Sequence, residues 1–117
     1  MNTTDSLIKE AREILKERTI CDVKVLDWQR NILKVRFYFA DDLFIQIYRN
    51  DRSQNTSFSL IFEDERLYGR DEIEGNWHRH PFQYPDLHNG SEDGNREVSL
   101  IEFYREVMEL LAKENIL

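Results

Sequence analysis

Residues 31–50 alternate between apolar and polar side chains, and this alternation constrains the fold more than any other feature of the sequence. The apolar series are Leu33, Val35, Phe37 and Phe39, then Leu43, Ile45 and Ile47. The side chains between them are Lys34, Arg36 and Tyr38, then Phe44, Gln46 and Tyr48. Successive side chains of a strand point to opposite faces of a sheet. The pattern therefore predicts two half-buried strands, near residues 31–40 and 43–50.

The short connection between these two strands predicts an antiparallel hairpin. A two-residue loop would pair Phe39 with Phe44 and mix the apolar face with the polar one. A three-residue loop over residues 40–42 keeps one face apolar, so we expect that loop. The pairs that it forms are Phe39 with Leu43 and Phe37 with Ile45.

Two further segments predict strands, and a third segment is ambiguous. Residues 57–63 repeat the alternation, and residues 20–28 are also strand-like. Residues 64–71 either extend the preceding strand or form a fifth one. Residues 72–97 predict a long loop, a kind of segment that often carries function. The glycines and prolines that favour a loop there are Gly75, Pro81, Pro85, Gly90 and Gly94.

Apolar residues at helical spacing mark both ends of the chain and predict helices over about residues 5–17 and 99–114. Thr4 or Asp5 is a suitable N-cap for the first helix. The second begins with Ser99-Leu100-Ile101-Glu102, a capping box in which Ser99 and Glu102 satisfy each other's free backbone N–H groups.

The order of these elements predicts a single α+β domain over residues 1–117. It consists of an N-terminal helix, an antiparallel four- to five-stranded meander, a long loop and a C-terminal helix. The simplest packing lays both helices on the apolar sheet face, as a two-layer sandwich. The 40% of hydrophobic residues, including 7 Phe, 5 Tyr and 2 Trp, are enough for a core. We expect Trp28 and Trp77 to be packing residues rather than residues that stack on a ligand.

The charge and the cysteine content of the chain limit the cellular compartment that we expect for the protein and the partners that it can bind. The net charge of −7 disfavours indiscriminate binding of nucleic acid, although a local basic patch in the N-terminal half could still hold RNA. The only cysteine, Cys21, cannot form an internal disulfide. No apolar run reaches about 18 residues, and the first ten residues hold Asp5, Lys9 and Glu10. We expect a cytoplasmic protein that does not associate with membranes.

All three histidines, His78, His80 and His88, lie in the predicted loop. Histidine titrates near neutral pH, acts as acid or base, and binds metals. The His78-x-His80 step places both rings on one side if the segment is extended. With His88 they could supply three nitrogen ligands to a metal ion, which is one interpretation of the cluster.

A second interpretation is RNA cleavage without a metal. Attack of a ribose 2′-hydroxyl on the adjacent phosphate needs a base, an acid and a cation for the developing charge. Two of the histidines could act as base and acid. Arg79, Arg70 or Arg36 could hold the phosphate, and Tyr38 and Tyr48 could stack on bases.

A third interpretation is a protein-interaction module without enzymatic activity, either antitoxin-like or homodimeric. Its binding surface would be the outer sheet face or the acidic end of the chain, and the net charge of −7 suits it. The sequence holds no glycine-rich phosphate loop, nucleophile elbow or paired-cysteine zinc motif, so we expect no cofactor.

Four segments of the chain resemble the TumE-type proteins of toxin–antitoxin modules. They are Leu60-Ile61-Phe62, Tyr68-Gly69-Arg70-Asp71, Trp77-His78-Arg79-His80-Pro81 and Pro85-Asp86-Leu87-His88. The resemblance implies a small cytoplasmic toxin with an RNase-like activity, held in check by a cognate antitoxin protein. The positions that match the motif are Arg70, Asp71, His78, His80 and His88.

The main hypothesis from the sequence is therefore a TumE-like ribonuclease that needs no metal. In it His80 and His88 act as base and acid, and Asp71 orients a histidine. Arg70 and Arg79 hold the phosphate. The interaction module and the metal-dependent hydrolase remain the alternatives.

Overall fold

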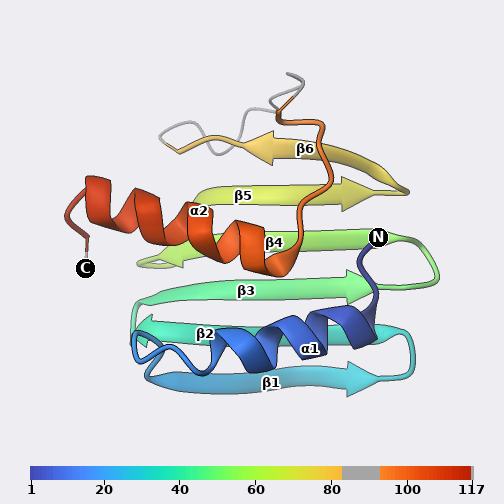
Figure 1. Ribbon diagram of the computed structural model, residues 1–117, viewed down its shortest axis with the longest axis horizontal. Helices are drawn as coiled ribbons and strands as arrows, with labels where there is room; N and C mark the ends of the chain where they lie inside the picture. Colours follow the sequence, from blue (N-terminus) through green and yellow to red (C-terminus); the bar gives the residue numbers. More distant parts are fainter. Residues whose placement is uncertain (83–92, 117) are drawn as a thin grey trace.

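Six strands form one antiparallel sheet in the computed structural model, which describes residues 1–82 and 93–116 (Figure 1). The strands are β1 (Asp22–Gln29), β2 (Ile32–Ala40), β3 (Leu43–Asn50), β4 (Asn55–Phe62), β5 (Glu65–Ile73) and β6 (Asn76–His80). The helices are α1 (Thr4–Ile14) and α2 (Leu100–Lys113). The strands lie in sequence order, so the sheet is the expected meander.

The expected α+β architecture is confirmed, but the sheet has more strands than predicted. Residues 65–73 form the fifth strand, and the first part of the predicted loop forms β6. The connections on both sides of β5 are two-residue turns in which Glu63, Asp64, Glu74 and Gly75 all have positive φ. This geometry is typical of type I′ turns, whose twist matches that of the paired strands.

Both helices lie on the same face of the sheet, which we call the helix-covered face (Figure 1). Its core is built from Phe37 and Ile45 of the sheet, Leu7 of α1 and Phe103 of α2, all buried. Trp77 is buried as expected. Trp28, by contrast, lies on the edge strand β1 and is 59% exposed, so it does not belong to the core.

The opposite face, which we call the open face, is not covered by α1 or α2 (Figure 1). Cross-strand pairing assigns residues to it, because paired residues share a face. One row runs from Arg36 through Gln46, Ser59 and Gly69 to His80. A second row runs from Lys34 through Tyr48, Ser57 and Asp71 to His78.

The β2–β3 hairpin differs from its prediction by one pair. Phe37 faces Ile45 as expected, but Leu43 faces Ala40 rather than Phe39. A bulge between Tyr38 and Ala40 takes up the additional residue. The chain thus keeps a two-residue turn, and Phe39 is still buried.

Capping residues determine where each of the two helices begins. α2 has the predicted Ser99 N-cap and capping box. α1 is shorter than predicted, and its N-cap is Thr3 rather than Thr4 or Asp5. The reason is a second capping box, in which Ser6 N–H donates to Thr3 Oγ1 (3.0 Å) and Thr3 N–H donates to Ser6 Oγ (2.9 Å). Neither helix is long and apolar enough to cross a membrane, and the described residues contain no other α-helix.

Candidate functional site

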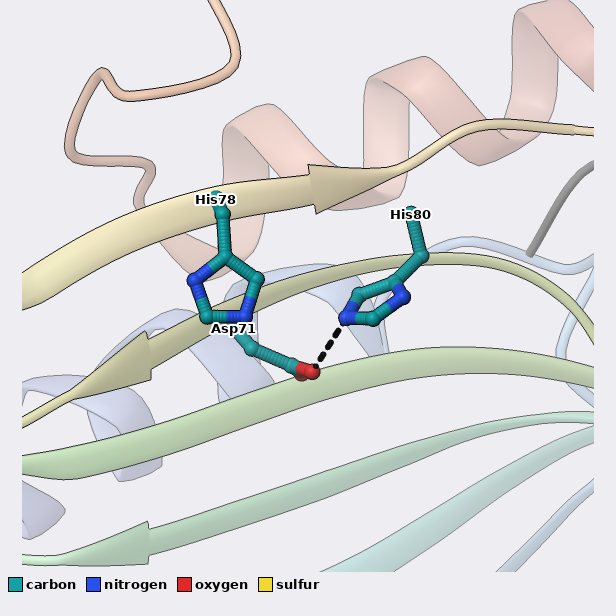
Figure 2. Close-up of side chains that lie close together, drawn as sticks. All are labelled: Asp71, His78 and His80. Atoms are coloured by element: carbon teal, nitrogen blue, oxygen red, sulfur yellow. Dashed lines mark ion pairs between the residues drawn. The ribbon is translucent and has the colours of Figure 1, made fainter. Parts of the chain in front are cut away.

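The β5–β6 hairpin brings Asp71, His78 and His80 together on the open face (Figure 2). Asp71 is the cross-strand partner of His78, and His80 lies two residues further along β6, so all three side chains share a face. Their carboxylate and imidazole ligand atoms lie within 4.8 Å of one another. The two imidazole ring centres are 5.3 Å apart, and the rings meet edge to face.

Asp71 holds His80 directly. Nε2 of His80 lies 2.9 Å from Oδ2 of Asp71, and both side chains are mostly buried (Figure 2). A carboxylate in this position fixes the orientation of an imidazole ring and stabilises the imidazolium that forms when the ring takes up a proton. The expectation that Asp71 orients a histidine therefore has a matching geometry.

Two further side chains, Arg66 and Ser57, hold Asp71 itself. Arg66 donates to both carboxylate oxygens, at 3.0 and 2.8 Å, and Ser57 Oγ donates to Oδ1 at 2.9 Å. Burial alone would raise the pKa of Asp71, but the hydrogen bonds and positive charge of Arg66 outweigh it and lower the pKa. Asp71 is therefore ionised at neutral pH, and Arg66 balances its charge.

Gly69 makes room for Arg66. The guanidinium of Arg66 lies over Gly69, where a Cβ would overlap it. From there Arg66 also donates to the carbonyl of Phe58 at 3.2 Å. Sequence reasoning missed Arg66 and Ser57, since neither belongs to a motif. The turn residues Glu74-Gly75 could have revealed the β5–β6 hairpin and hence the pairing of Asp71 with His78.

A basic and aromatic patch lies on the same face, over β1 to β3. It consists of Lys24, Arg36, Tyr38 and Phe44. Lys24 Nζ lies 5.1 Å from the centre of the Tyr38 ring, and the Arg36 guanidinium lies 4.7 Å from that of Phe44. The two rings are 4.9 Å apart and buried, so the patch presents its cations rather than its rings. Tyr38 is therefore not the open stacking surface that was expected.

The patch is separate from the histidines. Arg36 and His80 stand in the same cross-strand row, four strands apart. At a strand spacing of about 4.8 Å, this places them roughly 19 Å apart. Tyr48 lies closer, two strands from Asp71 in the neighbouring row. Arg36 and Tyr38 can therefore contact a long substrate beyond the reacting group, but they are too far away to contact the reacting group itself.

Arg70 and Arg79 lie on the helix-covered face and do not join the histidines. They face each other across β5 and β6, and Arg70 is the partner of core residue Phe58. Arg70 is fully buried and donates to Glu106 of α2 at 3.1 and 2.6 Å. Arg79 donates to Asp93 at 2.8 Å, and Asp93 also pairs with Arg70. The structure thus separates the expected phosphate-binding arginines from the expected acid and base.

The carboxylate of Glu106 is shared by Arg70 and Tyr68. Tyr68 Oη donates to Glu106 at 2.7 Å, and the pKa of Tyr68 is raised by burial and by this carboxylate. The arrangement ties α2 to β5 from inside the fold. We therefore assign Arg70 to the packing of α2 against the sheet rather than to a substrate site.

Of the predicted catalytic residues, Asp71, His78 and His80 converge, Arg70 does not, and His88 lies outside the described residues. Comparisons with known proteins add no relative. No family model matches the chain, and no curated protein or solved structure matches it. The resemblance to the TumE-type proteins therefore depends on the sequence motifs alone.

Proposed function

We propose that this protein cleaves RNA without a metal ion, as a cytoplasmic toxin that a cognate antitoxin restrains. The observation that supports the proposal most is the contact between Asp71 and His80, with His78 beside them on an open sheet face. Two of the four segments that resemble the TumE-type proteins, Tyr68-Gly69-Arg70-Asp71 and Trp77-His78-Arg79-His80-Pro81, contribute the residues of the same hairpin.

The contacts among Asp71, His80 and His78 suggest a role for each residue in the cleavage reaction. His80 takes the proton of a ribose 2′-hydroxyl, and the 2′-oxygen attacks the adjacent phosphorus. Asp71 stabilises the positive charge that forms on His80. The bond from phosphorus to the 5′-oxygen breaks, and His78 gives that oxygen a proton, leaving a 2′,3′-cyclic phosphate and a 5′-hydroxyl.

Positive charge on the open face, at a distance from the cluster, can hold an RNA strand despite the net charge of −7. Arg66 balances Asp71, so the cluster itself does not repel phosphate. Lys34 and Arg36 carry positive charge along the same face, while Asp27 of β1 is the cross-strand partner of Lys34. Bases can stack on the guanidinium plane of Arg36, and a phosphate can pair with Lys34.

The direct test is incubation of purified protein with RNA in EDTA. We expect cleavage products ending in a cyclic phosphate, and a loss of about 10²- to 10⁴-fold in rate in His80→Ala and His78→Ala. Arg79→Gln is the matched control, since Arg79 lies between the two histidines in sequence but on the other face. Intact RNA with the native protein, or equal loss in the control, would count against the proposal.

A divalent metal ion at Asp71, His78 and His80 is the second candidate, because three ligand atoms lie within 4.8 Å of one another. Two histidines and one carboxylate suit zinc or iron. Against it, Arg66 contacts both oxygens of Asp71 and would have to release one. Titration with zinc decides between metal-free RNA cleavage and a metal-dependent hydrolase. Stoichiometric zinc binding that His78→Ala abolishes would favour the hydrolase.

A further inference from the structure

The outer edge of β1 is an exposed apolar strand edge. In the sheet β1 pairs only with β2, so its other edge has no strand partner among the described residues. Val25, Leu26 and Trp28 are all exposed large apolar residues, and Leu15 after α1 is another. Such edges template pairing with another chain. β1 has no proline, but it carries Asp22, Lys24 and Asp27, so a strand that pairs with it must offer charges of opposite sign at the matching positions.

A hollow of about 140 Å³ adjoins this edge on the helix-covered face. Its walls come from α1, β1 and the neighbouring core, and they are apolar apart from Arg12. Val25 and Trp28 line the hollow from β1, and Leu15 lines it from the α1 side. The edge therefore offers a strand side without a strand partner among the described residues, together with apolar side chains that a further strand would cover.

The bulge in β1 determines which side chains face which way. Val25 pairs with Val35 and Asp27 with Lys34, so Leu26 is the additional residue. The bulge shifts the alternation by one position. As a result Val23 and Trp28 both lie on the helix-covered face, and Lys24 and Asp27 both lie on the open face.

We propose that a second copy of this chain occupies the edge, with its β1 antiparallel to the first. A two-fold axis between Val25 and Leu26 places Lys24 opposite Asp27 of the other copy, twice. It also places Val23 opposite Trp28. Because of the bulge, the two members of each pair lie on the same face of the joined sheet. Lys24 therefore meets Asp27 on the open face, and Val23 meets Trp28 on the helix-covered face.

In this dimer the two six-stranded sheets join into one continuous sheet. The histidine cluster lies on β5 and β6, at the far end of each sheet, and stays clear of the interface. The side chains of Val25, Leu26 and Trp28 lose their contact with water, which is the driving force for association. The interface is isologous, since the same residues contribute from each copy.

Charge reversal at the paired positions tests the proposal through the mass measured by light scattering after gel filtration. We expect a dimer for the native protein, and a dissociation constant raised at least about tenfold in Lys24→Asp and in Asp27→Lys, which each create two like-charge pairs. Mixing these two variants should restore a dimer, because each Asp of one then meets a Lys of the other. The double variant should also dimerise by itself.

Lys9→Asp is the matched control, because it makes the same charge change on the exposed side of α1 and should leave the dimer intact. A second measurement needs no variant: amide hydrogen exchange in residues 22–29 should slow as the native protein is concentrated. A native protein that stays monomeric up to roughly 1 mM would overturn the proposal. So would a dimer that neither reversal weakens, or exchange that is independent of concentration.

Discussion

At the scale of single residues, the histidine cluster depends on the missing side chain of Gly69. The Arg66 guanidinium occupies the space where a Cβ would stand, and from there it holds both oxygens of Asp71. Asp71 in turn contacts His80. A small change at Gly69 should therefore reach the histidine through two intervening side chains.

We expect Gly69→Ala to lower the rate of RNA cleavage at least about tenfold, because Arg66 must leave Asp71 and the ring of His80 loses its fixed orientation. Stability should also fall, because Asp71 loses the guanidinium that balances its charge, and this loss outweighs the smaller flexibility of alanine in the unfolded chain. Gly75→Ala is the matched control. Gly75 has a φ of 86°, so that variant should lose about 1 kcal/mol of stability and keep its cleavage rate. Loss of cleavage in Gly75→Ala but not in Gly69→Ala would contradict the roles assigned to the two glycines.

Arg70 gives a second residue-scale prediction, because the sequence motif and the structure assign it different roles. Replacing Arg70 by Met leaves Glu106 without its buried partner, and we expect about 3 kcal/mol less stability in urea unfolding. Cleavage per folded molecule should change little, since Arg70 lies on the other face from His80. If Arg70→Met lost cleavage but kept full stability, Arg70 would have to be assigned to the catalytic site after all.

At the scale of elements, a hairpin positions the histidine cluster, and a capping box fixes the start of the helix that supports this hairpin. The β5–β6 hairpin sets the spacing of Asp71, His78 and His80. Helix α2 supports that hairpin from behind, since Glu106 binds Arg70 of β5. The start of α2 depends in turn on the reciprocal hydrogen bonds of Ser99 and Glu102, both 3.1 Å.

Ser99→Ala should therefore destabilise the protein by about 1 kcal/mol, because it leaves an N-terminal amide of α2 without an acceptor. Ser99→Asp preserves an acceptor at the same place and should recover most of that loss. Thermal or urea unfolding measures both. Equal stability of the alanine and aspartate variants would show that the cap contributes nothing.

At the scale of the whole molecule, partly buried carboxylates make stability depend on pH. Burial would raise the pKa values of Asp51 and Asp71, but hydrogen bonds from Arg49 and Thr4, and from Arg66, lower them below the ordinary values. The stabilisation is fully present above the unfolded pKa, about 3.9 for Asp, and is lost as the pH falls through the folded pKa.

We therefore expect the free energy of unfolding to decrease on acidification below about pH 4. Asp71→Asn removes one of the groups responsible, so its stability should fall less steeply over the same range. Urea unfolding at several pH values measures both slopes. Stability that rises toward low pH, or equal slopes in the two proteins, would contradict the role given to Asp71.

The sequence by itself determined the fold class and several of its elements, because those features depend on local patterns. The alternation over residues 31–50 predicted β2 and β3, and the capping box predicted the start of α2. His78 and His80 share a face for the same reason, since side chains alternate along any extended segment. Asp71 was predicted to orient a histidine only through the family resemblance.

Only the tertiary structure decided which face each polar residue joins, because cross-strand register relates residues that no local pattern connects. Strand β6 has five residues and, in the part of the chain that the structure describes, a single neighbouring strand, so its sequence carried little strand signal and predicted a loop. Once it pairs with β5, Asp71 meets the histidines and Arg70 turns inward to Glu106. Arg66 reaches Asp71 only because Gly69 leaves space between them, which depends on the packed fold and not on sequence spacing.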